Sequence, residues 1–217
     1  MRQKIAAGNW KMNGTSAALD ELTALSKAPP MAECTIVICP PAPLLYRAVE
    51  QSSGTAIKIG AQDCHTATSG AHTGDVSAPM VADTGASYVI VGHSERREAY
   101  EEQNSDVLSK AEAARDAGLI AILFLGETLE DREANNTLDI IGGQLTGSVP
   151  DGANSTNLVV AYEPIWAIGT GLTATPEQAQ ETHAAIRKYL GEVAGADVAE
   201  NTRILYGGSA SGKVRRD

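Results

Sequence analysis

Seven short apolar segments recur along this chain, and stretches with helical spacing separate them. The segments are rich in β-branched residues and show little alternation, as expected of parallel strands covered on both faces. They lie at residues 5–9, 35–39, 57–61, 88–91, 119–125, 158–162 and 203–206. Repeated strand–helix units of roughly 30 residues produce a parallel sheet with right-handed crossovers. The pattern therefore predicts an α/β fold with seven strands.

Three helices are marked most clearly between these segments, at residues 17–27, 106–117 and 177–194. Ser16 and Ser105 precede the first two, where a serine hydroxyl can accept a hydrogen bond from an unpaired N–H of the first turn. Thr175 and Pro176 open the third helix, and Gly195 follows its end. We expect these residues to be the caps.

Two parallel architectures fit this order, an open doubly wound sheet and a (β/α) barrel. A dinucleotide-binding open sheet has Gly-x-Gly-x-x-Gly between its first strand and helix, whereas residues 8–14 read Gly-Asn-Trp-Lys-Met-Asn-Gly. Polar residues also follow several different strands, which is typical of a barrel with its site at the carboxyl ends of the strands. No linker or low-complexity segment interrupts the pattern, so the sequence predicts one barrel domain.

The composition narrows the class of partner. The 217 residues carry a formal net charge of -10, which argues against nucleic acid because a phosphate backbone requires a basic face. The longest apolar run, residues 119–125, is too short to span a membrane, and the N-terminal residues lack the apolar core of a signal peptide. The three cysteines show no Cys-x-x-Cys spacing, which favours reduced thiols and a cytoplasmic protein.

Glu163 is the strongest candidate for a catalytic group. It follows the apolar run at residues 158–162, so a buried strand would deliver its carboxylate to the carboxyl edge of the sheet. Pro-Ile-Trp at residues 164–166 stiffens the start of the next loop, and Gly-Thr-Gly at 169–171 lets it bend and offer N–H groups. A carboxylate beside a closing, anion-binding loop suggests proton abstraction from a small phosphorylated substrate.

Polar side chains also follow the first and fourth strands. His93 precedes a helical Ser-Glu-Arg-Arg-Glu run whose N-terminus disfavours an imidazolium. It is either a neutral group that polarises a carbonyl and shuttles a proton or a hydrogen-bonded structural residue. Asn9 and Lys11 are two residues apart, so extended backbone would project both into one mouth, although a turn Asn and a surface Lys are the plainer interpretation.

Two further carboxylates near strand ends are expected to be structural. Glu127 follows the strand at 119–125 but precedes a charged helix start rather than a lid. Glu95 is expected to pair with a nearby cation, either Lys11 or an arginine.

The remaining histidines are His65, His72 and His183. They show no zinc-like spacing with cysteines or carboxylates. We interpret them as surface or packing residues and expect no metal site.

A phosphate cradle is predicted from two glycine-containing loops. Tyr-Gly-Gly-Ser at residues 206–209 ends the seventh strand, and the N–H groups of Gly207, Gly208 and Ser209 can face an anion. Gly169 stands in the loop after the sixth strand. The two loops would follow neighbouring strands and could bind phosphate together.

Four segments together resemble the signature segments of the triosephosphate isomerase family, in the same order and spacing. They are Gly-Asn-Trp-Lys-Met-Asn at 8–13, Gly-His-Ser-Glu-Arg-Arg at 92–97, Ala-Tyr-Glu-Pro-Ile-Trp-Ala-Ile-Gly-Thr-Gly at 161–171, and Tyr-Gly-Gly-Ser at 206–209. The resemblance covers residue 1 to about residue 209, and the motifs together are highly specific. The barrel is named after this family, and the family is also the best-known case of a lid loop and of a Glu–His pair. The barrel, the lid and the Glu–His pair are therefore implied by the resemblance and are not separate evidence for it.

The resemblance implies an aldose–ketose isomerase of glycolysis and gluconeogenesis, which interconverts dihydroxyacetone phosphate and D-glyceraldehyde 3-phosphate through an enediol(ate). Glu163 would be the base, and His93 would polarise the carbonyl and shuttle the hydroxyl proton. Lys11 would balance the charge of the substrate and the enediolate, with Asn9 hydrogen-bonding nearby. No metal or organic cofactor is implied, because the stabilisation of the enediolate is electrostatic.

The resemblance extends to phosphate binding and to assembly. Gly169 and Ser209 would offer N–H groups to the phosphate. Residues 69–77 resemble the dimer loop of the family, so a homodimer through residues 65–79 is implied. Its arm would place Thr73 near the partner's Asn9.

The end of the chain departs from the family pattern. Family barrels have eight strands, whereas residues 1–209 contain seven, and residues 210–217 are interpreted as a tail outside the barrel. The last helix–strand–helix portion, with its phosphate-binding Gly-Gly pair, is missing from the pattern, so lowered activity is expected. The alternative functions are a barrel remnant that binds phosphate poorly, or a sugar-phosphate epimerase, whose metal ligands the strand ends do not offer.

Phe124, the only phenylalanine, is a second departure. The family commonly has a cysteine at this place. A larger ring needs space near the barrel mouth or must turn outward, which affects the fine geometry of the site.

Overall fold

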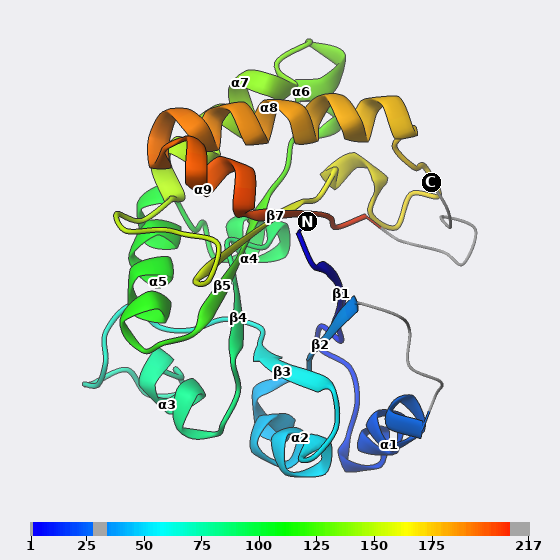
Figure 1. Cartoon of the computed structure of the whole chain (residues 1–217), viewed down its shortest axis with the longest axis vertical. Helices are drawn as coiled ribbons and strands as arrows, with labels where there is room; N and C mark the ends of the chain where they lie inside the picture. Colours follow the sequence, from blue (N-terminus) through cyan, green and yellow to red (C-terminus); the bar gives the residue numbers. More distant parts are fainter. Residues whose placement is uncertain (1, 28–33, 209–217) are drawn as a thin grey trace.

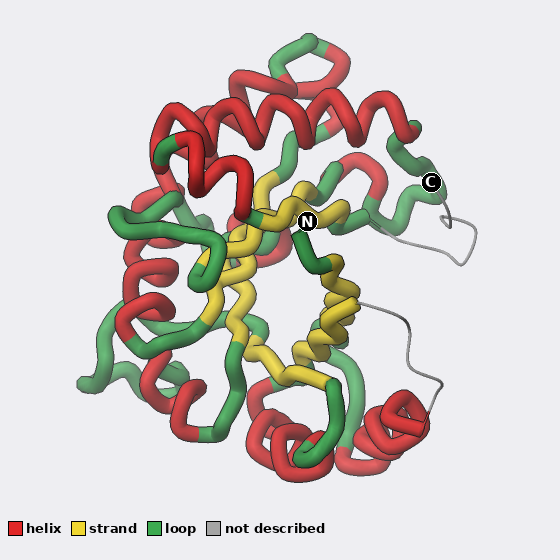
Figure 2. Tube along the Cα trace, in the orientation of Figure 1, coloured by secondary structure: helices red, strands yellow, loops and turns green. Residues whose placement is uncertain are grey.

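The strands surround a common axis, and the helices lie outside them. The computed structural model describes residues 2–27 and 34–208, and its strands form one parallel sheet in sequence order. These are β1 (Lys4–Asn9), β2 (Cys34–Cys39), β3 (Ile57–Ala61), β4 (Tyr88–Val91), β5 (Ile120–Leu125), β6 (Leu158–Tyr162) and β7 (Arg203–Tyr206). Figures 1 and 2 show them as the inner wall of a nearly closed (β/α) barrel. The barrel prediction is confirmed, and every strand begins and ends within one residue of its predicted place.

The helices follow the strands in the predicted alternation. They are α1 (Asp20–Lys27), α2 (Leu45–Ser52), α3 (Ala78–Asp83), α4 (Ser94–Ala99), α5 (Asn104–Asp116), α6 (Leu129–Glu133), α7 (Thr137–Ser148), α8 (Pro176–Ala194) and α9 (Ala196–Asn201). Three short 3₁₀ turns accompany them: η1 (Ser16–Leu19), η2 (Ala42–Leu44) and η3 (Ile165–Ala167). None of the helices in the described part of the chain is long and apolar enough to cross a bilayer.

Two of the three predicted N-caps are wrong. Ser16 lies inside η1, whose cap position is Thr15, and α1 only begins at Asp20. Ser105 lies inside α5, where the Asp106 carboxylate instead accepts the N–H of Gln103 at 2.8 Å. An acidic residue in the first turn can reach back to the cap, as in a capping box. The Thr175 cap is confirmed, because its hydroxyl accepts the Gln178 N–H at 3.2 Å.

The side chains of the strands divide into two hydrophobic layers. The outer layer packs the strands against the helices, and a smaller inner cluster fills the barrel, including Val37, Tyr88, Ile90, Ile122, Val159 and Ala161. Successive residues of a strand point to opposite sides. In β6, therefore, Val159 and Ala161 face the barrel axis, and this alternation directs Glu163 inward as well.

The two ends of the sheet, β1 and β7, are less covered than the middle. Every residue of β4 and β6 is buried, whereas β7 is half-buried throughout and β1 has exposed positions. A cavity of about 670 Å³ lies between them, lined by Arg2, Lys4, Ile5, Arg187, Arg203 and Leu205 among others. The tail predicted at residues 210–217 lies outside the described residues.

Candidate active site

Glu163 occupies the end of β6 and is almost fully buried, with 3% of its surface exposed. Its N–H donates to the Leu125 carbonyl at 2.7 Å, which continues the β5–β6 ladder one residue beyond the strand. Gly126 makes this close approach possible, because a Cβ there would lie 2.0 Å from the Glu163 carbonyl oxygen. The carboxylate is thus delivered to the carboxyl edge of the barrel by rigid backbone on two strands.

His93 follows β4 after a sharp turn at Gly92, whose φ of 69° is rarely adopted by other residues. It occupies the N-cap position of α4, and its Nδ1 accepts the N–H of Glu95 at 3.2 Å. Because Nδ1 is an acceptor, the proton of the neutral imidazole lies on Nε2. Nε2 is 3.3 Å from Oε1 of Glu163, so the two candidate residues face each other directly.

The surroundings of His93 favour its neutral form. Only 4% of the residue is exposed, and this burial lowers the pKa of the imidazole below its usual value near 6.5. The carboxylates of Glu163 and Glu95 act in the opposite direction, and the Lys11 ammonium supports the lowering. Desolvation is the largest of these influences, so His93 is neutral at pH 7.

Ser94 holds the second oxygen of the Glu163 carboxylate. Its hydroxyl donates to Oε2 at 2.7 Å, and its N–H lies at 3.4 Å from the same atom. The carboxylate is therefore oriented by His93 on one oxygen and by Ser94 on the other.

Lys11 and Asn9 extend this cluster from the end of β1. The Lys11 ammonium pairs with Glu95 at 2.7 Å, as predicted, and the Lys11 N–H donates to the Asn9 side chain at 2.9 Å. Lys11 has a left-handed backbone with a φ of 52°. The Gln62 amide donates to the Lys11 carbonyl at 2.8 Å and to the Cys39 carbonyl at 2.9 Å, which stabilises this conformation.

The predicted phosphate loops follow neighbouring strands, since β6 pairs with β7. Gly207 donates its N–H to the Tyr162 carbonyl at 2.6 Å, and a Cβ built on Gly207 would lie 3.5 Å from Cβ of Glu163. The glycine turn after β7 thus lies beside the carboxylate, with Gly208 next. Gly169 is exposed in the lid loop, and no atom lies within 4 Å of a Cβ built on it. Ser209 lies outside the described residues.

Glu127 is fully buried behind the site and anchors the lid. Its Oε1 accepts hydrogen bonds from the Tyr162 hydroxyl at 3.0 Å, the Trp166 indole at 2.9 Å and Arg132 at 3.0 Å. Burial, together with this carboxylate, raises the pKa of the Tyr162 phenol. Glu127 therefore holds the base of the lid, where Trp166 belongs to η3, rather than facing the mouth.

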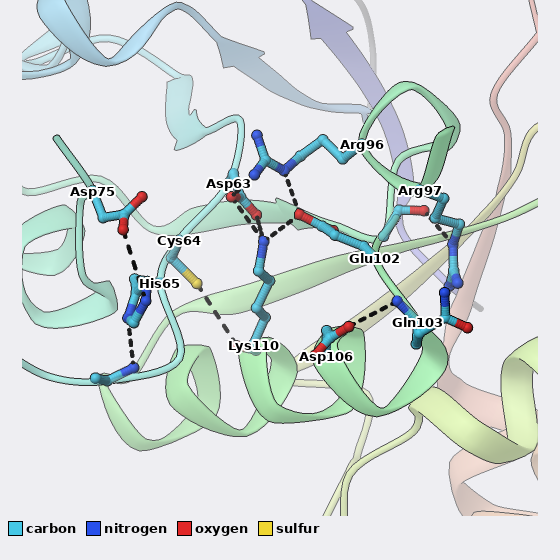
Figure 3. A network of polar contacts seen from close by, with 12 residues as sticks. Asp63, Cys64, His65, Asp75, Arg96, Arg97, Glu102, Gln103, Asp106 and Lys110 are labelled. Carbon is cyan, nitrogen blue, oxygen red and sulfur yellow. Dashed lines mark hydrogen bonds and ion pairs between the residues drawn. The ribbon is translucent and has the colours of Figure 1, made fainter. Parts of the chain in front are cut away.

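A second, partly buried charge cluster joins the loop after β3 to α4 and α5 (Figure 3). Lys110 on α5 donates to Asp63 at 2.8 Å and to Glu102 at 2.5 Å, and Arg96 on α4 pairs with the same two carboxylates at 2.9 and 2.7 Å. Two cations and two anions are thereby matched in a poorly solvated place. The cluster ties the loop after β3 to the helix that follows His93.

Three further groups come together in the loop after β3. The rings of His65 and His72 stack with centroids 4.0 Å apart, and Asp75 Oδ2 is 3.8 Å from His65 Nε2. One potential ligand atom from each lies within 4.8 Å of the others. However, His65 Nδ1 accepts the Ala67 N–H at 2.9 Å, so in the neutral ring Nε2 carries a proton and offers no lone pair to a cation. His65 is half-buried and His72 is exposed, and the expectation of no metal site stays a prediction.

The structure brings most of the predicted residues to one mouth, and it adds others that the sequence did not identify. Contacts join Glu163 to His93 and Lys11 to Glu95, and a Cβ built on Gly207 would lie 3.5 Å from Cβ of Glu163. Ser94 and Gln62 were not predicted to act there. Each lies within a few residues of the end of a predicted strand, and this position was the only feature of the sequence that indicated a place in the site.

Comparisons with known proteins agree with this geometry. The family model described as triosephosphate isomerase matches residues 4–215. A triosephosphate isomerase from Ruegeria pomeroyi is 58% identical over 96% of this chain and 83% of its own, and one from Dinoroseobacter shibae is 56% identical over 96% and 85%. The crystal structure of triosephosphate isomerase from Bartonella henselae is 44% identical, covering 96% of this chain and 84% of its own with a TM-score of 0.88.

Proposed function

Because this chain belongs to the triosephosphate isomerase family, we propose that Glu163 and His93 are the residues with which it interconverts dihydroxyacetone phosphate and D-glyceraldehyde 3-phosphate. The observation that carries this proposal is their 3.3 Å approach at the carboxyl edge of the barrel. The extent of the match favours the isomerase over a barrel remnant that only binds phosphate weakly.

Glu163 takes a proton from one carbon of the substrate and returns it to the neighbouring carbon through an enediol(ate). Two carbons of the substrate can share this one carboxylate because they are bonded to each other. Neutral His93 donates its Nε2–H to the carbonyl oxygen and moves the hydroxyl proton. Its Nδ1 contact with the Glu95 N–H keeps the donor on the substrate side.

Lys11 supplies the positive charge that the enediolate and phosphate require. In a mouth that contains the carboxylates of Glu163 and Glu95, an ammonium offsets the local negative charge. Asn9 positions Lys11, because its side-chain oxygen accepts the Lys11 N–H. The side-chain NH₂ group of Asn9 donates to a substrate oxygen. No metal or organic cofactor enters this sequence of steps.

The phosphate is held between the lid and the turn after β7. Gly169 and Gly208 contribute backbone N–H groups, which favour an anion. The prediction for Gly207 is wrong, because its N–H donates to the Tyr162 carbonyl and so shapes the turn instead, and the predicted Ser209 donor lies outside the described residues. Support comes from the position of Gly207 beside Glu163 and from the anchoring of the base of the lid by Glu127. Closure of the lid excludes water around the enediolate.

The chain assembles as a homodimer through residues 65–79, and it acts in the cytoplasm. The loop is rich in small residues. Two large apolar side chains are exposed: Met80 on α3, which follows the loop in sequence, and Met12, which follows β1 near the site. The arm would bring Thr73 near the partner's Asn9. The free thiols of all three cysteines support a reducing compartment.

Glu163→Gln tests the assignment of the base. We expect kcat in a coupled isomerase assay to fall by several orders of magnitude, while a phosphate-bearing substrate analogue still binds, because only proton transfer is removed. Glu130→Gln, an exposed position on α6, is the matched control. Near-normal turnover of Glu163→Gln would exclude Glu163 as the base. The wild-type assay is repeated with a chelator, since loss of activity there would favour a metal-dependent epimerase instead.

A further inference from the structure

Phe124 lies at the top of an inward-facing row of side chains on β5. Ile120, Ile122 and Phe124 alternate with outward-facing residues, and all three belong to or pack against the cluster that fills the barrel. The strand register pairs Phe124 with Ala161, two residues before Glu163. The phenyl ring therefore forms the uppermost layer of the barrel interior, directly below the mouth.

The ring contacts His93 through its face. The two ring centroids are 4.8 Å apart with an interplanar angle of 35°. Cε1 of Phe124 would also lie 3.3 Å from a Cβ built on Gly207. The phenyl group thus lies close to both the imidazole and the turn after β7, and its side chain points inward.

The hydrogen bonds of His93 leave one movement of its ring unrestrained. Nδ1 meets the Glu95 N–H, and Nε2 meets Glu163 Oε1, so both contacts lie at the edges of the ring. Edge contacts fix the direction of the two nitrogens, but they restrain only weakly a tilt about the line that joins them. The second torsion of a histidine side chain is broad, so it does not prevent this tilt either. A contact on the face of the ring does.

The phenyl ring also covers part of the surface of the His93 ring. Glu163 and Glu95 stabilise an imidazolium there, whereas Lys11 and burial disfavour it. Water admitted below the ring would weaken the desolvation that dominates this balance. Phe124 carries no hydrogen-bond acceptor that could replace water and stabilise a second N–H.

We propose that Phe124 is a positioning residue, whose ring forms the apolar floor that holds the His93 imidazole neutral and aimed at Glu163 and the substrate. The inference rests on the proposed roles of His93 and Glu163. It concerns a residue that does not touch the reacting atoms and acts through His93 alone.

The test compares Phe124→Ala and Phe124→Leu with Ile122→Val. Ile122 belongs to the same inward row two residues deeper, so its variant perturbs the barrel interior without removing the floor below His93. We expect Phe124→Ala to lower kcat by roughly 10- to 100-fold with a much smaller change in KM, as a displaced catalytic group does. Phe124→Leu should be intermediate, because it remains apolar but loses the flat face.

The decisive readout is ¹⁵N NMR of His93 across a pH titration, in protein labelled at its four histidines. We expect the wild type and Ile122→Val to retain a single tautomer with the proton on Nε2. In Phe124→Ala, His93 should become a mixture of tautomers and titrate at higher pH. If the Ala variant does not fold, Phe124→Leu and Phe124→Met carry the same comparison.

Two results would overturn the proposal. One is a Phe124 variant with the tautomer, titration and kcat of Ile122→Val, which would reduce Phe124 to a packing residue. The other is a His93 titration that moves to lower pH, since the phenyl face would then be stabilising the imidazolium by a cation–π contact. The NMR signature is read without turnover, so it separates failure of this proposal from failure of the Glu163 assignment.

Discussion

The hydroxyl of Ser94 donates a 2.7 Å hydrogen bond to Oε2 of Glu163, which joins the residue after His93 to the residue after β6. Residues 69 positions apart in the sequence thus share one buried contact. The geometry of the Glu163 carboxylate therefore depends on α4 as well as on its own strand.

Ser94→Ala should lower kcat/KM. A hydrogen bond to a charged group contributes roughly 1.5–3 kcal/mol, which corresponds to roughly a 10- to 100-fold decrease if the whole contribution orients the carboxylate. The measurement is steady-state kinetics in the coupled assay. Ser109→Ala is the control, because the Ser109 hydroxyl bonds only to its own helix at the Ser105 carbonyl. Equal rates in both variants would show that His93 alone orients Glu163.

Glu127→Gln should destabilise the fold and loosen the lid. It removes the buried carboxylate that pairs with half-buried Arg132 and weakens the acceptor for Trp166 and Tyr162. Breaking a buried ion pair costs roughly 3–5 kcal/mol. Urea unfolding measures this loss, and the fluorescence of Trp166 reports on the lid. Glu130→Gln, exposed on the neighbouring helix, should stay within about 0.5 kcal/mol of the wild type; a similar value for Glu127→Gln would contradict an anchoring role.

Alkylation of the native protein should modify Cys34 first. Cys39 and Cys64 are buried, and burial raises the pKa of each thiol to about 12, so the reactive thiolate is scarce at neutral pH. Cys34 is only half-buried. Intact-mass analysis after brief treatment with iodoacetamide should find one adduct, and three after unfolding in urea. Rapid modification of Cys39 or Cys64 in the native state would mean that the barrel opens readily.

The free energy of unfolding should decrease as the pH falls below about 6.5. Burial lowers the pKa of His93 and of His183, with Arg187 adding to the effect at His183. Below the pKa of these histidines in the unfolded chain, the unfolded chain binds protons that the folded protein does not. The free energy of unfolding therefore decreases as the pH falls toward the lower pKa values of the folded protein. Urea titrations at pH 7.5, 6.5 and 5.5 measure the slope, and His183→Gln should reduce it. An unchanged slope would assign the effect to His93 or to other groups.

Sedimentation should find a dimer at micromolar concentration if residues 65–79 form the proposed interface. Thr73→Arg places a long charged side chain at the tip of the loop and should shift the protein toward monomer. Thr156→Arg, in the exposed turn before β6, is the matched control. A wild-type monomer under these conditions would refute the dimer proposal.

The strands and the position of Glu163 were predictable because each depends on local sequence. An apolar run reports a covered parallel strand, and Glu163 inherits its direction from the alternation of β6. The helix α7 was not predicted, because Gly142 and Gly143 oppose helix formation. Packing decides in its favour, since Gly142 lets Tyr189 of α8 approach closely.

The supporting contacts could not be predicted, because they join residues that are distant in sequence. Lys110 reaches Asp63 over 47 positions, and Gln62 reaches Lys11 over 51. The misplaced caps have a more local cause. Ser16 and Ser105 are good cap residues by type. The helix α1 begins later than Ser16 suggests because η1 comes first, and α5 begins earlier than Ser105 suggests because the Gln103–Asp106 contact caps it.

The order of the strands has a consequence for the way in which the chain acquires its structure. Each strand from β1 to β7 pairs with the one made just before or after it. Pairings between sequence neighbours close shorter loops than a pairing between the first and last strands, so they cost less loop-closure entropy. A ribosome would release the partners in the order in which they pair, so the sheet can grow strand by strand during synthesis. Among the described strands, β7 is the last to join, beside β6.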